Sequence, residues 1–69
     1  MIKSYRNKRN HHKCIDVKVT NDHHYLWRQL MKFDNGIVNN VCTKKGGFRR
    51  QNKGTIIEVL KDYEVIDND

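Results

Sequence analysis

The chain has 69 residues, no proline and only 9% aromatic residues, and a chain of this length forms one small domain with a thin core. Its 14 basic and 8 acidic residues give a net charge of +6, and such a basic excess is typical of nucleic-acid-binding proteins. The length argues against a multidomain enzyme and against a deep active-site cavity.

The N-terminal segment is basic. Residues 1–13 carry five basic side chains and no acidic one, and they lack the apolar stretch of a signal peptide. No apolar run in the chain is long enough for a membrane-spanning helix. We therefore expect a cytoplasmic protein with no membrane role, in which Cys14 and Cys42 are reduced thiols. We expect residues 1–12 to form a flexible basic arm, residues 13–66 a single small domain, and residues 67–69 a frayed tail.

Three segments have the pattern of β-strands. Residues 14–20 alternate between apolar and polar side chains, which predicts a half-buried strand. Residues 23–33 fit a strand or a helix, but the Asn35-Gly36 pair that follows favours a strand, because Asn-Gly is the strongest short-range hairpin signal and suits a type I′ turn. Residues 37–42 then form the returning strand.

The last third of the chain fits more than one type of secondary structure. Residues 43–54 are predicted to form a basic, glycine-containing loop. Residues 55–66 begin with Thr55 and Glu58 at the spacing of a capping box, which predicts a helix. A hairpin with its turn at Lys61-Asp62 is the alternative, because β-branched residues are frequent there.

These elements predict an α+β fold: a three-stranded antiparallel sheet with one C-terminal helix across its apolar face. The alternative is a small all-β SH3-like barrel with five strands. In the first fold, the second face of the sheet is left open to a partner.

The basic residues concentrate in two acid-free segments, the arm and the 43–54 loop. Arginine and lysine side chains that neutralise phosphates dominate sequence-independent binding to nucleic acids, and an aromatic ring between them offers a surface for stacking on a base. The predicted nucleic-acid-binding residues therefore share a positive charge or an aromatic ring, and two of them lie on the predicted sheet: Arg6, Lys8, Arg9, Arg28, Lys32, Lys44, Lys45, Phe48, Arg49 and Arg50.

Histidines and cysteines give no recognisable metal site. Four histidines and two cysteines are able to bind zinc, but no pair has the spacing of a zinc knuckle, so we expect no metal and no cofactor. No nucleophile has an evident base or oxyanion hole near it in sequence. We therefore expect the protein not to be an enzyme.

The run SYRNKRNHHK, a Trp-containing segment and the C-terminal LKDYEVID together resemble small uncharacterised proteins from phages and prophages of low-GC Gram-positive bacteria. The predicted strand–strand–strand–helix order is similar to the arm-type DNA-binding domains of some phage and transposon integrases. In that family the open sheet face enters the major groove, and Arg28 and Lys32 occupy the corresponding positions.

Together these observations predict a small nucleic-acid-binding accessory protein encoded by a phage or prophage, with duplex DNA favoured over RNA. The alternative is a protein–protein interaction module that inhibits or modulates an enzyme. The sequence leaves the oligomeric state open.

Overall fold

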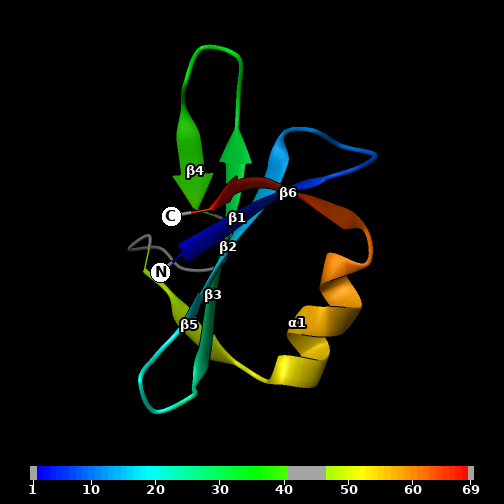
Figure 1. Cartoon of the computed structure of the whole chain (residues 1–69). Coiled ribbons are helices and arrows are strands. Elements are labelled where there is room, and N and C mark those ends of the chain that lie inside the picture. Colours follow the sequence, from blue (N-terminus) through cyan, green and yellow to red (C-terminus); the bar gives the residue numbers. More distant parts are fainter. Residues whose placement is uncertain (1, 41–46, 69) are drawn as a thin grey trace.

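The computed structural model describes residues 2–40 and 47–68. Over these residues the chain forms six antiparallel strands and one helix (Figure 1). The elements in chain order are β1 (Ile2–Asn7), β2 (Lys13–Val19), β3 (Tyr25–Lys32), β4 (Val38–Asn40), β5 (Arg49–Gln51), α1 (Lys53–Leu60) and β6 (Tyr63–Asn68).

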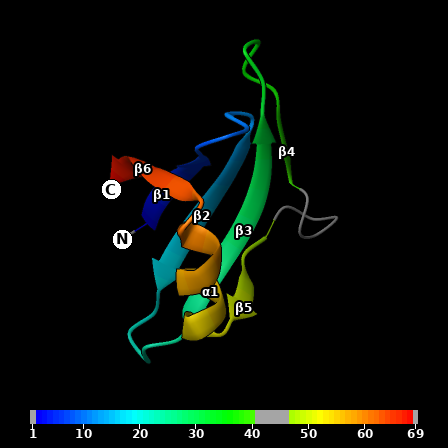
Figure 2. The same ribbon diagram turned by 90° about the vertical axis from the view of Figure 1, so that its right-hand side faces the viewer.

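The strands form a single sheet in the order β4-β3-β2-β1-β6, and β5 also pairs with β3. Because β2 occupies one edge of β3, both β4 and β5 pair with its other edge. Strand β4 pairs with residues 30–32 of β3, and β5 pairs with residues 25–27. Figure 2 shows β4 and β5 one after the other along this edge.

The predicted three-stranded sheet with a C-terminal helix is therefore wrong, and the five-stranded alternative also has too few strands. The predicted strands at residues 14–20 and 23–33 are confirmed as β2 and β3. Compared with the predicted sheet, the observed sheet has three additional strands, β1, β5 and β6. None of the three has a clear alternation of apolar and polar residues. Their pairing comes from backbone hydrogen bonds to neighbouring strands, which residue type predicts only weakly.

Residues 2–7, which the sequence assigned to a flexible arm, lie inside the sheet. Strand β1 pairs with β2 on one side and with β6 on the other. Ser4 and Tyr5 explain this position, because Ser4 is buried and hydrogen-bonded while Tyr5 packs against the core. At the other end of the chain, β6 continues to Asn68 and so includes residues 67 and 68 of the expected tail.

The segment expected to be either helix or hairpin contains a helix followed by a strand. Helix α1 begins after Asn52, whose side-chain oxygen accepts a hydrogen bond from the backbone N–H of Gly54 at 2.7 Å. The predicted capping role of Thr55 is therefore wrong. The helix ends at Leu60, and β6 begins at Tyr63 after the turn that the hairpin alternative placed at Lys61-Asp62.

The β3–β4 connection is a hairpin, as the sequence predicted. Gly36 has a positive φ of 83°, a conformation that glycine adopts without strain. Asn35 does not have a positive φ, so the expected type I′ turn is wrong. Instead, the Asn35 side chain accepts a hydrogen bond from the backbone N–H of Ile37 at 3.1 Å. The returning strand was expected at residues 37–42, of which 41 and 42 lie outside the described residues.

The core lies between α1 and one face of the sheet. Ile56 of the helix packs against buried residues of β2 and β3, with a ring of half-buried aromatic and aliphatic side chains around them. The buried members are Ile15, Val17, Trp27 and Ile56, and those packed around them are Tyr5, Tyr25, Val59, Leu60 and Tyr63. Figure 2 shows α1 beside the sheet. The first residues of the helix, 53–55, and Ile57 on its flank are exposed.

Candidate nucleic-acid interface

Predicted nucleic-acid-binding residues from the two basic segments lie at opposite ends of the sheet. Lys8 and Arg9 follow β1 in the loop that leads to β2, and this loop contacts the end of β3 through a 2.8 Å hydrogen bond from the Lys32 N–H to the His12 carbonyl oxygen. Arg50 pairs with Leu26, near the other end of β3. Figure 1 shows the two ends, with the β1–β2 loop at the top and β5 at the bottom. The predicted residues therefore do not form one continuous surface.

Arg6 of β1 is engaged by an acidic side chain. Its guanidinium donates a hydrogen bond to a Glu64 carboxylate oxygen at 2.9 Å. This hydrogen bond lowers the pKa of Glu64 below its ordinary value. The charge of Arg6 is therefore balanced within the protein, which makes it a weaker phosphate ligand than an unpaired arginine.

Arg28 is also engaged within the fold. Its Nε and Nη2 atoms each lie 2.9 Å from an oxygen of Asp16, and the second oxygen of Asp16 accepts a hydrogen bond from the Ser4 hydroxyl at 2.7 Å. The Phe48 ring lies against Arg28 and Lys18, with their cationic groups 4.7 and 4.6 Å from the ring centroid. Through these contacts, Phe48 holds the residue directly before β5 against the sheet.

The remaining predicted residues differ in position. Lys32 is half-buried on the same face of β3 as Arg28, near the β3–β4 hairpin. Arg49 is the neighbour of Arg50 in β5 and pairs with Trp27. Lys44 and Lys45 lie outside the described residues.

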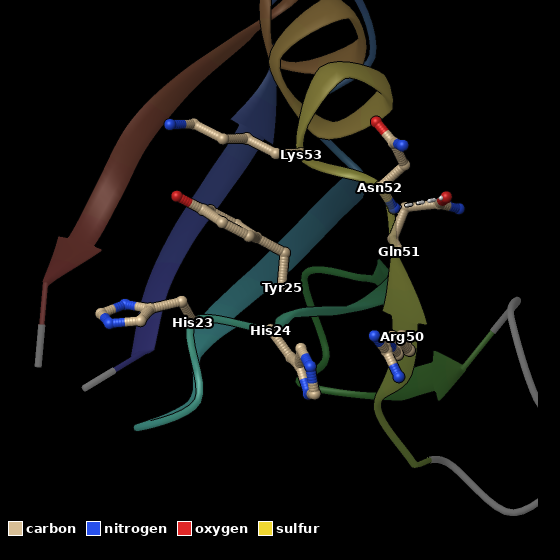
Figure 3. Close-up of a pocket in the computed structure, with 7 residues that line it drawn as sticks. All are labelled: His23, His24, Tyr25, Arg50, Gln51, Asn52 and Lys53. Atoms are coloured by element: carbon tan, nitrogen blue, oxygen red, sulfur yellow. Dashed lines mark hydrogen bonds between the residues drawn. The ribbon is translucent and has the colours of Figure 1, made fainter.

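A pocket at the lower end of the sheet brings together two short runs of residues, 23–25 and 50–53, that lie far apart in the sequence. It has a volume of about 700 Å³, and Figure 3 shows the side chains that line it. None of these residues is acidic. We call it the β5–α1 pocket, and it is lined by His23, His24, Tyr25, Arg50, Gln51, Asn52 and Lys53.

The β2–β3 turn brings the two histidines to this pocket. The turn is closed by hydrogen bonds of 2.9 Å between the backbones of Thr20 and His24 and between those of His23 and Thr20. His23 has a positive φ of 62°, an uncommon conformation for a residue other than glycine. This conformation lets two adjacent histidines line the same pocket, although neighbours on a strand would point to opposite faces.

The N-terminal end of α1 forms another side of the pocket. Asn52 and Lys53, the residues at which the helix begins, both line it. The first turn contains no acidic residue, so nothing there neutralises the partial positive charge of the helix N-terminus. Arg50 enters from β5, and Lys53 adds a second permanent positive charge. The pocket is thus electropositive on several sides.

Of the predicted residues that the structure describes, only Arg50 lines this pocket. The sequence did not single out His23, His24 and Lys53 as candidate anion-binding residues, because the histidines were interpreted as zinc-capable donors or as surface residues. The available signal was a His-His pair directly after a turn, although the turn itself contains an acidic residue, Asp22. The partner segment, β5, is located only by its pairing with β3, 22 to 26 residues away in sequence.

Other chemistry has less support in the described residues. No three His, Cys, Asp or Glu side chains come together there in an arrangement that could hold a metal ion. Burial raises the pKa of the Cys14 thiol, which disfavours the reactive thiolate. Within the described part of the chain, no helix is long and apolar enough to cross a membrane.

Comparison with protein-family models, with curated proteins and with solved structures finds no match to this chain. The function is therefore argued from the site. The alternative of a protein-interaction module stays a prediction, and the exposed apolar side chains of Phe33, Ile37 and Val38 around the β3–β4 hairpin are the surface on which it would rest.

Proposed function

We propose that the protein is a non-enzymatic nucleic-acid-binding protein that contacts backbone phosphates through the β5–α1 pocket. The observation that carries this proposal is the convergence of Arg50, Lys53 and two histidines in a pocket without an acidic residue. Arginine and lysine pair with phosphate oxygens, and a helix N-terminus favours an anion. These are the groups that proteins use to hold a nucleic-acid backbone.

The rest of the molecule supports the proposal in two ways. The net charge of +6 attracts a polyanion from a distance and speeds its association. Lys18 lies at the same end of the sheet as the pocket, across Leu26 from Arg50, so a backbone that passes the pocket meets a further positive charge. The opposite end carries Lys8 and Arg9, and it is a separate surface.

The experiment compares charge reversal at the two ends. The test variant is Arg50→Glu/Lys53→Glu, and the matched control is Lys8→Glu/Arg9→Glu. Each Lys or Arg→Glu change removes two units of charge, so both double variants lower the net charge from +6 to +2. Binding to a fluorescein-labelled oligonucleotide is measured by fluorescence anisotropy at several salt concentrations.

We expect the wild-type protein to bind more weakly as salt rises, because binding releases condensed counterions. The Arg50→Glu/Lys53→Glu variant should lose at least roughly ten-fold in affinity, and its slope of log K against log salt should be shallower by about 1 to 2, since each lost phosphate contact contributes about 0.7 to 0.9. The control should lose clearly less. Equal losses in the two variants would contradict the site, and no binding by the wild-type protein at low salt would contradict the function.

A further inference from the structure

A second, apolar pocket adjoins the β5–α1 pocket. It lies between α1 and the strands β1 and β2, and it has a volume of about 440 Å³. Tyr25 and Lys53 line both pockets, so the two share a wall. We call the second pocket the apolar groove, and it is lined by Lys3, Tyr5, Val17, Val19, Tyr25, Lys53, Ile56, Ile57 and Leu60.

The apolar groove leaves large side chains in water. Ile57 is 53% exposed and Val19 is 44% exposed, although a ligand that covered them would gain about 25 cal/mol for each Å² removed from water. Among the described side chains that line the groove, the charged ones are Lys3 and Lys53, and none is acidic. The groove therefore suits a ligand with a flat apolar part and a negative charge beside it.

Tyr25 is the residue that joins the two pockets. Its ring is half-buried, and the Lys53 ammonium lies 5.8 Å from the ring centroid. In Figure 3 the side chains of Tyr25 and Lys53 extend in the same direction, toward β1, while His24 and Arg50 lie on the side of β5. Positive groups therefore stand on both sides of an aromatic ring. This is how proteins that bind single strands combine stacking with phosphate contacts.

We infer that the protein recognises single-stranded nucleic acid, with one unpaired base in the apolar groove beside Tyr25 and the adjacent phosphates in the β5–α1 pocket. This inference rests on the proposed function, because the phosphate contacts are those already described. The faces of bases in a duplex are covered by their neighbours, so only an unpaired, splayed base enters such a groove. The inference replaces the sequence-based preference for duplex DNA. It also places base stacking at Tyr25 instead of Phe48, because Lys18 and Arg28 both pack closely on the Phe48 ring, at 4.6 and 4.7 Å, whereas Lys53 lies farther from the Tyr25 ring, at 5.8 Å.

The first test uses three probes of equal length: a single-stranded oligonucleotide, its duplex, and an abasic strand with the same phosphates but no bases. The expected result is that the base-bearing strand binds roughly ten-fold or more tightly than the abasic strand, as base–aromatic stacking contributes on this scale. It should also bind more tightly than the duplex.

The second test changes the groove while leaving the charge constant. The variant Val19→Ser/Ile57→Ser removes one exposed valine and one exposed isoleucine from the groove, and Ile37→Ser/Val38→Ser removes the same two residue types, similarly exposed, from the β3–β4 hairpin. Only the groove variant should lose the preference for the base-bearing strand. Thermal unfolding of both variants checks that they are folded. Photocrosslinking of the wild-type protein to a 5-iodouridine strand gives a measurement independent of any substitution, and the crosslink should map to the peptide that contains Tyr25.

The outcomes separate this inference from the function on which it rests. Equal binding of the abasic and base-bearing strands, with a steep salt dependence, would overturn the groove assignment and leave the phosphate site intact. A duplex bound as tightly as the single strand would overturn the inference as well. Absence of binding to every probe would overturn both proposals.

Discussion

At the scale of single residues, the most informative side chain is a buried carboxylate. Asp16 of β2 is only 4% exposed, and it accepts hydrogen bonds from Ser4 and from Arg28. Removing one partner of a buried ion pair leaves the other charge uncompensated. Because the Arg28 side chain is partly exposed, water recovers some of that cost. We expect Asp16→Asn to lower the free energy of unfolding by about 2 kcal/mol.

Chemical denaturation measures this change, with the dependence on denaturant expected to stay the same in both proteins. The matched control is Glu58→Gln, which makes the same acid-to-amide change in the exposed Lys61–Glu58 pair. Exposed pairs contribute little, so the control should lose less than about 0.5 kcal/mol. If both substitutions cost the same, the buried network does not stabilise the sheet.

At the scale of secondary-structure elements, α1 depends on its first residues. A helix of eight residues is not stable alone, and Asn52 satisfies one of its otherwise unpaired N–H groups. We expect Asn52→Ala to lower the free energy of unfolding by about 1 kcal/mol. Thr55→Ala should change it by less than about 0.5 kcal/mol, because Thr55 lies inside the helix. A larger loss from Thr55→Ala than from Asn52→Ala, measured by denaturation, would restore the capping box predicted from the sequence.

A comparison of the predicted with the observed strands shows how far the local sequence pattern determines each element. Strand β2 was predicted from the alternation of its apolar and polar residues. Strand β3 was predicted from the Asn35-Gly36 hairpin signal that follows it. Strand β1 was missed because Lys3 and Arg6 made it look like a solvated arm, whereas its pairing with β2 and β6 satisfies its backbone. Strand β5 has no apolar residue and is positioned by its pairing with β3. Residues 55–66 matched both alternatives because the boundary at Leu60 depends on β6 pairing with a strand that is distant in sequence.

The candidate site was also predictable only in part, because it too depends on contacts between residues that are distant in sequence. Sequence charge identified Arg50 and the general basic character, but a pocket is defined by tertiary structure. It requires the β2–β3 turn to meet the consecutive residues 50–53, which join β5 to the start of α1, and this contact is not local. Charge patterning also could not show that Arg6 and Arg28 are paired with Glu64 and Asp16.

At the scale of the whole molecule, the first strand is essential to the fold, because β1 is the only link between β2 and β6 in the described sheet. We expect deletion of residues 1–7 to abolish cooperative unfolding, with loss of the near-ultraviolet circular dichroism of Trp27, the single tryptophan. The control, Lys8→Gln/Arg9→Gln, removes charge from the adjoining loop and should unfold cooperatively. A truncated chain that unfolds like the full chain would show that residues 1–7 are an arm.

The pairing of β1 with β6 has a consequence for how the domain can be connected to other chains. Lys3 lies opposite Asn68 across two hydrogen-bonded strands, and both views place the two ends on the same side of the molecule (Figures 1 and 2). The polypeptide therefore leaves the domain where it entered. A domain built in this way can be grafted as a cassette into a surface loop of a carrier protein without its ends being pulled apart, and a short linker between those ends would close it into a ring.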